Sequence, residues 1–317
     1  MDKFLNKYET VTYDKIKAVA DKVGAHVFSK VRLADVLPVN NSGISDAEFG
    51  FALKSHVDFL VTNSEQEPQF CVEFDGPKHR DTEQVRRDEI KNGLFERFDM
   101  PYMRINARYL ADRYRGLDLL TFFVDVWFLS IAFHDSQAAG HIPSDEPFDP
   151  TFILSNGSDR SWPYWLSWNL QVKIRRLYDQ GRIAQLAPSH WIGADGRGNL
   201  RCIAWLFITE DGCLFIETGM RKHRFPAVYC SEVLAQLAVY DLYDILVPAL
   251  QGQKTLSPPS EVDKRLRYYQ ANYEMLSAAS CGPPERKGEQ DGAANGSQPI
   301  RSETNGTSSA AGSRRSP

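Results

Sequence analysis

Several features that would restrict the function of this 317-residue chain are missing from it. Its five cysteines are scattered and have no Cys-x-x-Cys spacing, so the sequence predicts neither a disulfide framework nor a zinc site. The first ten residues carry charges where a secretory signal needs an apolar core, so we expect a cytoplasmic protein. No P-loop, dinucleotide-binding glycine pattern or Ser-His-Asp signature occurs, so those enzyme classes lack support.

An excess of positive charge is also missing. Lysine and arginine number 37 against 41 aspartates and glutamates, which gives a net charge of -4. Binding to nucleic acid would therefore depend on a local basic patch rather than on the field of the whole protein. The 42% hydrophobic and 25% charged content is that of a soluble globular protein with a sizeable core.

Apolar runs long enough to span a bilayer are missing too, and the most apolar stretch is LLTFFVDVWFLSIAF at residues 119–133. It is shorter than the roughly 20 residues that span a bilayer, and Asp125 lies in its middle. We therefore expect a buried helix over residues 117–134 and no membrane association. The alternative for this helix is an interface in a homo-oligomer.

The order of predicted elements in the first part of the chain indicates an α/β domain. A helix capped by Thr12 is followed by a strand that begins at His26 and by a loop over residues 38–46. The segments SHVDFLVT and QFCVEFDG are predicted as antiparallel strands joined by the polar NSEQEP. A helix at 82–98 with an Asp81–Gln84 capping pair, then the strand YMRIN, completes a crossover in which the last two strands run parallel.

The remainder of the chain predicts a different organisation. We expect a first domain over residues 1–135, a linker at 136–150, a mostly helical α+β accessory domain at 151–279 and a disordered tail at 280–317. Within the accessory domain, RCIAWLFIT and CLFIETG predict a hairpin that turns at Asp211-Gly212, and residues 261–279 predict a helix.

Three carboxylates interrupt the two central strands of the first domain. Glu73 and Asp75 share one face of their strand because side chains alternate along it, and pairing with the neighbouring strand brings Asp58 close to Glu73. Adjacent carboxylates repel each other unless a cation lies between them. Oxygen ligands of this kind suit Mg²⁺, with Mn²⁺ as the alternative, and such an ion can activate water and polarise a phosphodiester.

These residues carry a resemblance to a known family. The pattern HVDFLV…CVEFDGPKH…RRDEIKNGLFERFDMPYMRIN resembles the PD-(D/E)XK nuclease superfamily over roughly residues 10–110. Within it the chain looks like the branch called DUF2726, which is related to very-short-patch-repair endonucleases. The resemblance implies a restriction-endonuclease-like core, a mixed central sheet flanked by helices.

The resemblance also implies roles for individual residues. Asp58 and Glu73 occupy the metal-ligand positions, and Asp75 stands where the commonest pattern has a lysine. Asp75 is then a further ligand, or a cation from elsewhere takes over, for which Lys91 on the following helix is the candidate. The first helix of relatives tends to carry a glutamate, for which Glu9 and Asp14 both remain open.

A local basic patch near these acids could bind the phosphates of DNA, with RNA not excluded. Its candidate residues are Lys78, His79, Arg80 and Arg87. The plainer interpretation is a turn and a solvated helix face, and Asp58 could then be paired with Arg104 for structural reasons alone. The sequence thus predicts a metal-dependent endonuclease acting on DNA, and the alternative is an inactive nuclease-like module that binds nucleic acid or protein.

Overall fold

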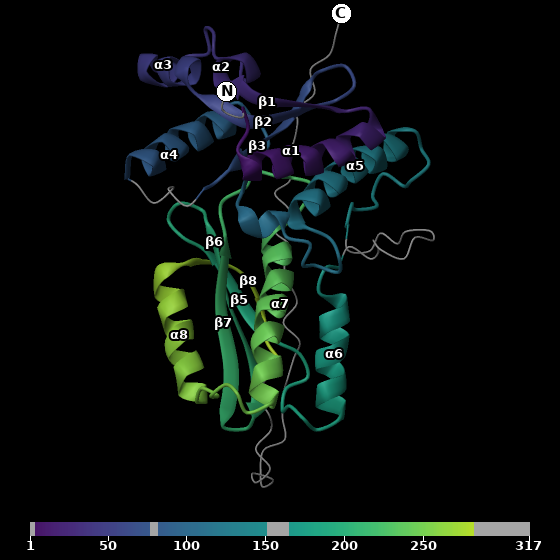
Figure 1. The fold of residues 1–317 in the computed structure, drawn as a ribbon, viewed down its shortest axis with the longest axis vertical. Coiled ribbons are helices and arrows are strands. Elements are labelled where there is room, and N and C mark those ends of the chain that lie inside the picture. Colours follow the sequence, from purple (N-terminus) through teal and green to yellow (C-terminus); the bar gives the residue numbers. More distant parts are fainter. Residues whose placement is uncertain (1–3, 77–81, 151–164, 282–317) are drawn as a thin grey trace, which may run out of the picture. The chain divides into compact units, whose positions relative to one another are not determined.

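The computed structural model describes residues 4–76, 82–150 and 165–281, and its first sheet has four strands in the order β1-β2-β3-β4. The β1–β2 and β2–β3 pairs are antiparallel, whereas β3 and β4 run parallel, as the strand–helix–strand pattern predicts (Figure 1). The strands are β1 (His26–Arg32), β2 (His56–Thr62), β3 (Pro68–Phe74) and β4 (Tyr102–Ile105).

The first helix, α1 (Lys7–Ala20), begins earlier than predicted because a better cap precedes Thr12. The Asn6 side chain accepts hydrogen bonds from the backbone N–H groups of Tyr8 and Glu9, and the Glu9 carboxylate accepts one from the Asn6 backbone N–H. This reciprocal capping box satisfies several N–H groups of the first turn. Thr12 is instead buried inside the helix, so the prediction that it caps the helix is wrong.

Two short helices occupy the segment between β1 and β2. They are α2 (Leu33–Val36) and α3 (Asp46–Lys54). A second capping box, formed by Ser45 and Glu48, starts α3 at the end of the predicted loop. The predicted crossover helix is confirmed as α4 (Thr82–Arg97), while the capping residue Asp81 lies outside the described residues.

The apolar run forms α5 (Leu119–Ala138), which is capped by the Asp118 side chain and lies against α1 (Figure 1). By length and composition alone, α5 and α7 (Cys230–Leu250) could each cross a membrane. Both helices nevertheless contribute buried side chains to the protein core, as core helices of a soluble protein do. Self-association through residues 117–134 and a cytoplasmic location both stay predictions.

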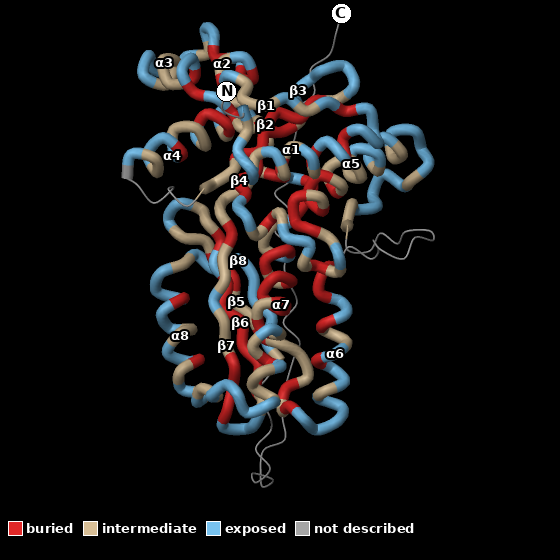
Figure 2. The backbone as a smooth tube through the Cα atoms, viewed as in Figure 1, coloured by how far each residue is buried: buried red, intermediate tan, exposed pale blue. Residues whose placement is uncertain are grey.

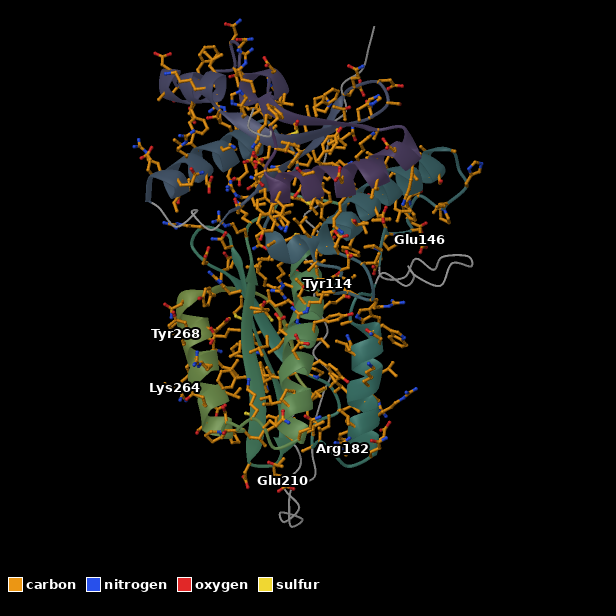
Figure 3. All side chains as sticks on the ribbon, in the orientation of Figure 1. Tyr114, Glu146, Arg182, Glu210, Lys264 and Tyr268 are labelled. Atoms are coloured by element: carbon orange, nitrogen blue, oxygen red, sulfur yellow. The ribbon has the colours of Figure 1, made fainter. Side chains whose placement is uncertain are left out.

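The second sheet has the order β7-β6-β5-β8 and is larger than the predicted hairpin. The hairpin is confirmed, but Thr209 pairs with Gly212, so its turn residues are Glu210 (labelled in Figure 3) and Asp211. The last strand replaces the end of the helix predicted at 261–279. The elements are α6 (Trp168–Asp179), β5 (Ser189–Ala194), β6 (Leu200–Thr209), β7 (Gly212–Met220), α8 (Pro259–Asn272) and β8 (Glu274–Ala279).

One hydrophobic cluster extends through both sheets of the described region. It joins Ile16 and Phe123 of the first part to Leu206 and Leu242 of the second. Figure 2 shows buried positions running along α7 and the second sheet. The division into domains at 1–135 and 151–279 stays a prediction, and the predicted disordered tail falls almost wholly outside the described residues.

Candidate functional site

Four charged residues occupy matching positions on the four strands of the first sheet. The register pairs Glu73 of β3 with Arg104 of β4. The same register continued by one residue sets Asp58 of β2 opposite Glu73, and Asp58 Oδ2 accepts a 2.8 Å hydrogen bond from the Phe74 N–H. Lys30 completes the row on β1, so two facing carboxylates lie between two cations.

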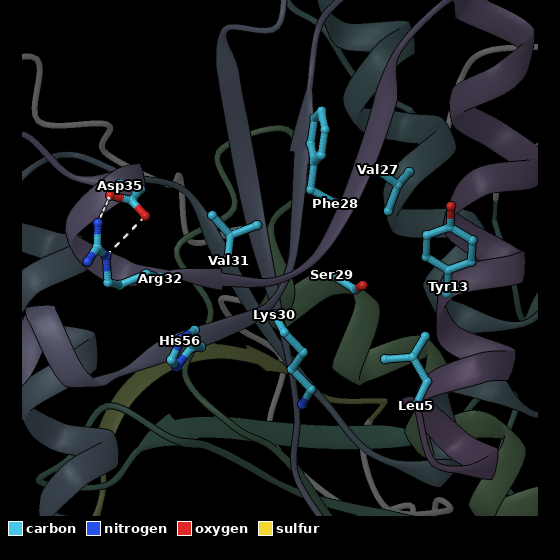
Figure 4. Close-up of a pocket in the computed structure, with 10 residues that line it drawn as sticks. All are labelled: Leu5, Tyr13, Val27, Phe28, Ser29, Lys30, Val31, Arg32, Asp35 and His56. Atoms are coloured by element: carbon cyan, nitrogen blue, oxygen red, sulfur yellow. Dashed lines mark hydrogen bonds and ion pairs between the residues drawn. The ribbon is translucent and has the colours of Figure 1, made fainter. Parts of the chain in front are cut away.

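Lys30 reaches Asp58 through an unusual backbone conformation. Its φ of 56° lies in the left-handed region, which costs about 1–2 kcal/mol for a residue with a Cβ. Residues two apart in a regular strand share a face, yet the side chains of Phe28 and Lys30 extend in opposite directions (Figure 4). The turned ammonium donates 2.6 Å hydrogen bonds to Asp58 Oδ1 and to Glu9 Oε1.

Glu9 is therefore the residue of the first helix that joins the site, and the exposed Asp14 does not. Burial opposes the charge of Lys30, but its hydrogen bonds to Asp58 and Glu9 outweigh burial and raise the pKa of Lys30. A surface cavity of about 760 Å³ adjoins this ammonium (Figure 4). The cavity is lined by Leu5, Tyr13, Val27, Phe28, Ser29, Lys30, Val31, Arg32, Asp35 and His56.

Lys91 of α4 completes the site at Glu73. Its ammonium donates to Glu73 Oε2 at 2.7 Å and to the His56 carbonyl at 2.9 Å. Burial raises the pKa of Glu73 above its ordinary 4.5, with a smaller contribution from Asp58, while Lys91 opposes the rise. Glu73 Oε1 is buried and has no hydrogen-bond partner among the described residues. We call Glu9, Lys30, Asp58, Glu73 and Lys91 the lysine cluster.

Asp75 belongs to a second set of charges. Arg104 Nη2 lies 2.8 Å from Asp75 Oδ1 and 2.7 Å from Asp88 Oδ1, and its Nη1 donates to Asn92. Arg221, which follows β7, lies 3.0 Å from Asp75 Oδ2 and 3.3 Å from Asp88 Oδ2. We call Asp75, Asp88, Arg104 and Arg221 the arginine cluster. Arg104 thus pairs with Asp75 and Asp88 rather than with Asp58, which corrects the structural alternative for Asp58.

A histidine fixes the backbone beneath the arginine cluster. The Arg104 N–H donates to His223 Nδ1 at 3.0 Å, which assigns the proton of the neutral ring to Nε2. Nε2 lies 2.7 Å from the Tyr109 hydroxyl, so both ring nitrogens have partners. Burial lowers the pKa of His223 to about 3.

The predicted phosphate-binding residues are only partly described. Lys78, His79 and Arg80 lie outside the described residues. Arg87 is exposed on α4. The sequence did not indicate Lys30, Arg221 or His223 as site residues. Lys30 lies within a predicted strand, and Arg221 and His223 lie in the charged segment MRKHRF, which carries no recognisable motif.

The lysine cluster meets the requirements of Mg²⁺ with two carboxylates. Among the described residues no three His, Cys, Asp or Glu side chains gather into a metal site. Mg²⁺ does not need three, because it usually keeps several waters and takes one or two carboxylates. The unpartnered Oε1 of Glu73, beside Asp58, is the oxygen that such an ion would satisfy. Asp58 and Glu73 therefore fit the ion.

The first part of the chain matches a known family. A family model described as a protein of unknown function, DUF2726, matches residues 1–116. No curated protein and no solved structure matches the chain. The resemblance to DUF2726 is thus confirmed for residues 1–116, and the link to the PD-(D/E)XK superfamily stays a prediction. This segment carries the whole lysine cluster and the arginine cluster except for Arg221.

Proposed function

We propose that the first region is a metal-dependent nuclease that hydrolyses phosphodiester bonds in DNA on a restriction-endonuclease-like core. The observation that carries the proposal is the facing pair of Asp58 and Glu73, with one Glu73 oxygen buried and unpartnered. An acid pair of this kind needs a cation, and the neighbouring ammonium groups leave that oxygen unsatisfied. The order α1-β1-β2-β3-α4-β4 supports the proposed core.

Asp58 and Glu73 would hold Mg²⁺ or Mn²⁺, which supplies a polarised phosphate and an activated water when bound. Lys91 lies 2.7 Å from Glu73 and is the cation available to a phosphate at that position. Its ammonium would position the attacking water and offset charge developing on the phosphate. Asp75 has a positioning role in this proposal, because its carboxylate holds Arg104 and Arg221.

The second candidate function is a nuclease-like binding module without turnover. The observation that favours it is that each carboxylate of the pair already has a lysine partner at 2.6–2.7 Å. In that case Lys30 and Lys91 replace the metal permanently. The two functions differ in whether a divalent ion displaces the lysines.

Incubation of the full chain with plasmid, single-stranded DNA and RNA, in Mg²⁺, Mn²⁺ or chelator, tests the proposal. We expect metal-dependent cleavage of DNA that is lost in Asp58→Asn and Glu73→Gln and retained in Asp14→Asn, a matched control on the exposed part of α1. Cleavage should also be largely lost in Lys91→Arg, since the planar guanidinium of arginine does not replace the compact ammonium of lysine. A parent protein that cleaves none of the substrates with either metal would refute the nuclease and favour the binding module.

Calorimetric titration separates metal binding from turnover. Divalent binding should weaken strongly in Asp58→Ala and Glu73→Ala but persist in Lys91→Met. If both carboxylate variants bind the ion as the parent does, the proposed metal site is misplaced.

A further inference from the structure

A polar cleft with a volume of about 600 Å³ lies between α4, β4 and the second sheet. Its lining includes the side chains of five arginines but only two acids, Asp88 and Glu89. The arginines are Arg104, Arg108, Arg197, Arg201 and Arg221. This cleft is separate from the cavity beside Lys30.

Most of this positive charge is already compensated. Arg104 and Arg221 pair with Asp75 and Asp88 in the arginine cluster. Arg108 donates to Asp241, Thr218 and Tyr114, and Arg197 lies 3.1 Å from Glu89. These contacts make a rigid, polar wall whose guanidinium groups are held in place.

Arg201 differs from the other four. Within the described part of the chain it has no hydrogen bond and no ion pair, although it sits in the middle of a sheet. Its neighbours on both adjacent strands are glycines, Gly193 on β5 and Gly219 on β7. A Cβ at Gly219 would lie 2.8 Å from Arg201 Nη1, so the guanidinium occupies the space that a side chain would fill. The sheet thus leaves room for an exposed arginine that makes no direct hydrogen bond or ion pair with the described residues.

We propose that the cleft binds a phosphate group of a nucleotide unit, with Arg201 as its main ligand. A guanidinium presents a planar fork that matches two phosphate oxygens, and an arginine held against a sheet loses less conformational freedom on binding. Arg221 and Arg197, with side chains 36% and 64% exposed, border the same space; their charges are paired with acids, but their guanidinium groups offer further N–H donors. Arg104, buried beneath them, fixes the floor of the site.

The phosphate could come from a free mononucleotide or from a nucleic-acid strand. The chemistry of recognition is the same, and the cleft volume lies within the range of about 300–1,000 Å³ for small-ligand sites. This inference goes beyond the nuclease and does not require cleavage, because Arg201 lies outside the lysine cluster.

Isothermal titration of the full chain, in chelator and at constant ionic strength, tests the inference. The probes are inorganic phosphate, thymidine 5′-monophosphate, a single-stranded oligonucleotide of eight thymidines, and thymidine as the phosphate-free control. We expect a phosphate probe to bind and Arg201→Gln to weaken it roughly ten- to hundredfold, the effect of losing a charge-assisted hydrogen bond. Arg201→Lys should restore part of the affinity, because it keeps the charge but not the fork.

Arg175→Gln is the matched control, since Arg175 is an exposed arginine on α6 that pairs with Asp179 of the same helix. The melting temperature of Arg201→Gln should stay close to that of the parent, because Arg201 makes no hydrogen bond or ion pair with the described residues. Binding of the monophosphate identifies a free nucleotide as the source, and binding of the oligonucleotide alone identifies a strand.

The inference is overturned if no phosphate probe binds, if thymidine binds equally well, or if Arg201→Gln and Arg175→Gln behave alike. Cleavage without phosphate binding refutes this inference alone, and binding without cleavage refutes the nuclease alone.

Discussion

The lysine cluster and the arginine cluster hold the same number of central carboxylates in different ways. Asp58 and Glu73 are neutralised by single ammonium groups, one of which, on Lys30, is 30% exposed. Asp75 and Asp88 share the guanidinium of Arg104, which is 1% exposed and whose three nitrogens all have partners. One cluster has a buried oxygen without a partner, and the other is held by two arginines.

This difference suggests a binding site in the lysine cluster and a structural role for the arginine cluster. An ammonium is a compact charge on a flexible stem, so another cation can replace it, whereas a guanidinium fixes the geometry of several acceptors at once. In the lysine cluster, another cation could therefore take the place of an ammonium group. The arginine cluster fixes the end of β3 to β4 and α4.

The largest expected effect is from Arg104→Met. Removing a buried cation leaves Asp75 and Asp88 without their main partner, and breaking a buried pair in this way costs about 3–5 kcal/mol. The free energy of unfolding, measured in urea, should fall by that amount. Arg175→Met, which breaks an exposed pair on α6, should change it by less than about 1 kcal/mol. Equal losses in the two variants would contradict a structural role for the arginine cluster.

Lys91→Met should have an intermediate effect that a metal can reverse. The variant leaves Glu73 buried without a cation, but Glu73 can take up a proton, so we expect a loss of about 2 kcal/mol in chelator. Mg²⁺ should then raise the melting temperature of Lys91→Met more than that of the parent. No such gain is expected for Arg104→Met, and an equal gain in both variants would remove the distinction between the clusters.

The smallest expected effect, counted per pH unit, concerns His223. The pKa of His223 is lowered from its ordinary 6.5 to about 3 in the folded protein. Between pH 3 and pH 6.5, His223 is therefore protonated in the unfolded chain and neutral in the folded chain. The stability of the parent should therefore fall as pH drops from 6.5 towards 3, with a contribution of up to about 1.4 kcal/mol per pH unit. His223→Phe should flatten this slope, and His26→Asn, an exposed control, should not. A slope unchanged in His223→Phe would show that other groups dominate the acid response.

Much of the first sheet could be predicted because its signals are local. Alternation in HVDFLV and CVEFDG gave both central strands, and the crossover pattern gave the parallel β3–β4 pair. The same alternation brought Asp58 and Glu73 together, and the helix following them brought Lys91 to Glu73. The strands and the Asp58–Glu73 pair need only the periodicity of each element, whereas the role of Lys91 came from the resemblance.

The residues that were missed depend on contacts distant in sequence. Lys30 joins the site through a left-handed φ, which is uncommon for a residue with a Cβ, so the alternation of a regular strand does not indicate that its side chain reaches Asp58. Arg221 is more than a hundred residues from Asp75 in the sequence. Nothing in its local sequence distinguishes it from an arginine exposed to solvent, because its position depends on the contact between the loop after β7 and β4. Strands β5 and β8 were missed because their pairing partners are supplied by the rest of the second sheet.

The contact between the loop after β7 and β4 affects the tendency of two copies of the chain to associate through their sheet edges. Tyr102 and Arg224 exchange both backbone hydrogen bonds, which covers the outer side of β4, while left-handed Lys30 interrupts β1 at the opposite side of the sheet. Unpaired sheet edges are templates on which a second chain can add a strand and polymerise. A fragment ending at residue 116, where the family match ends, would keep the acid pair but uncover β4. The second region therefore protects the first from self-association by strand addition.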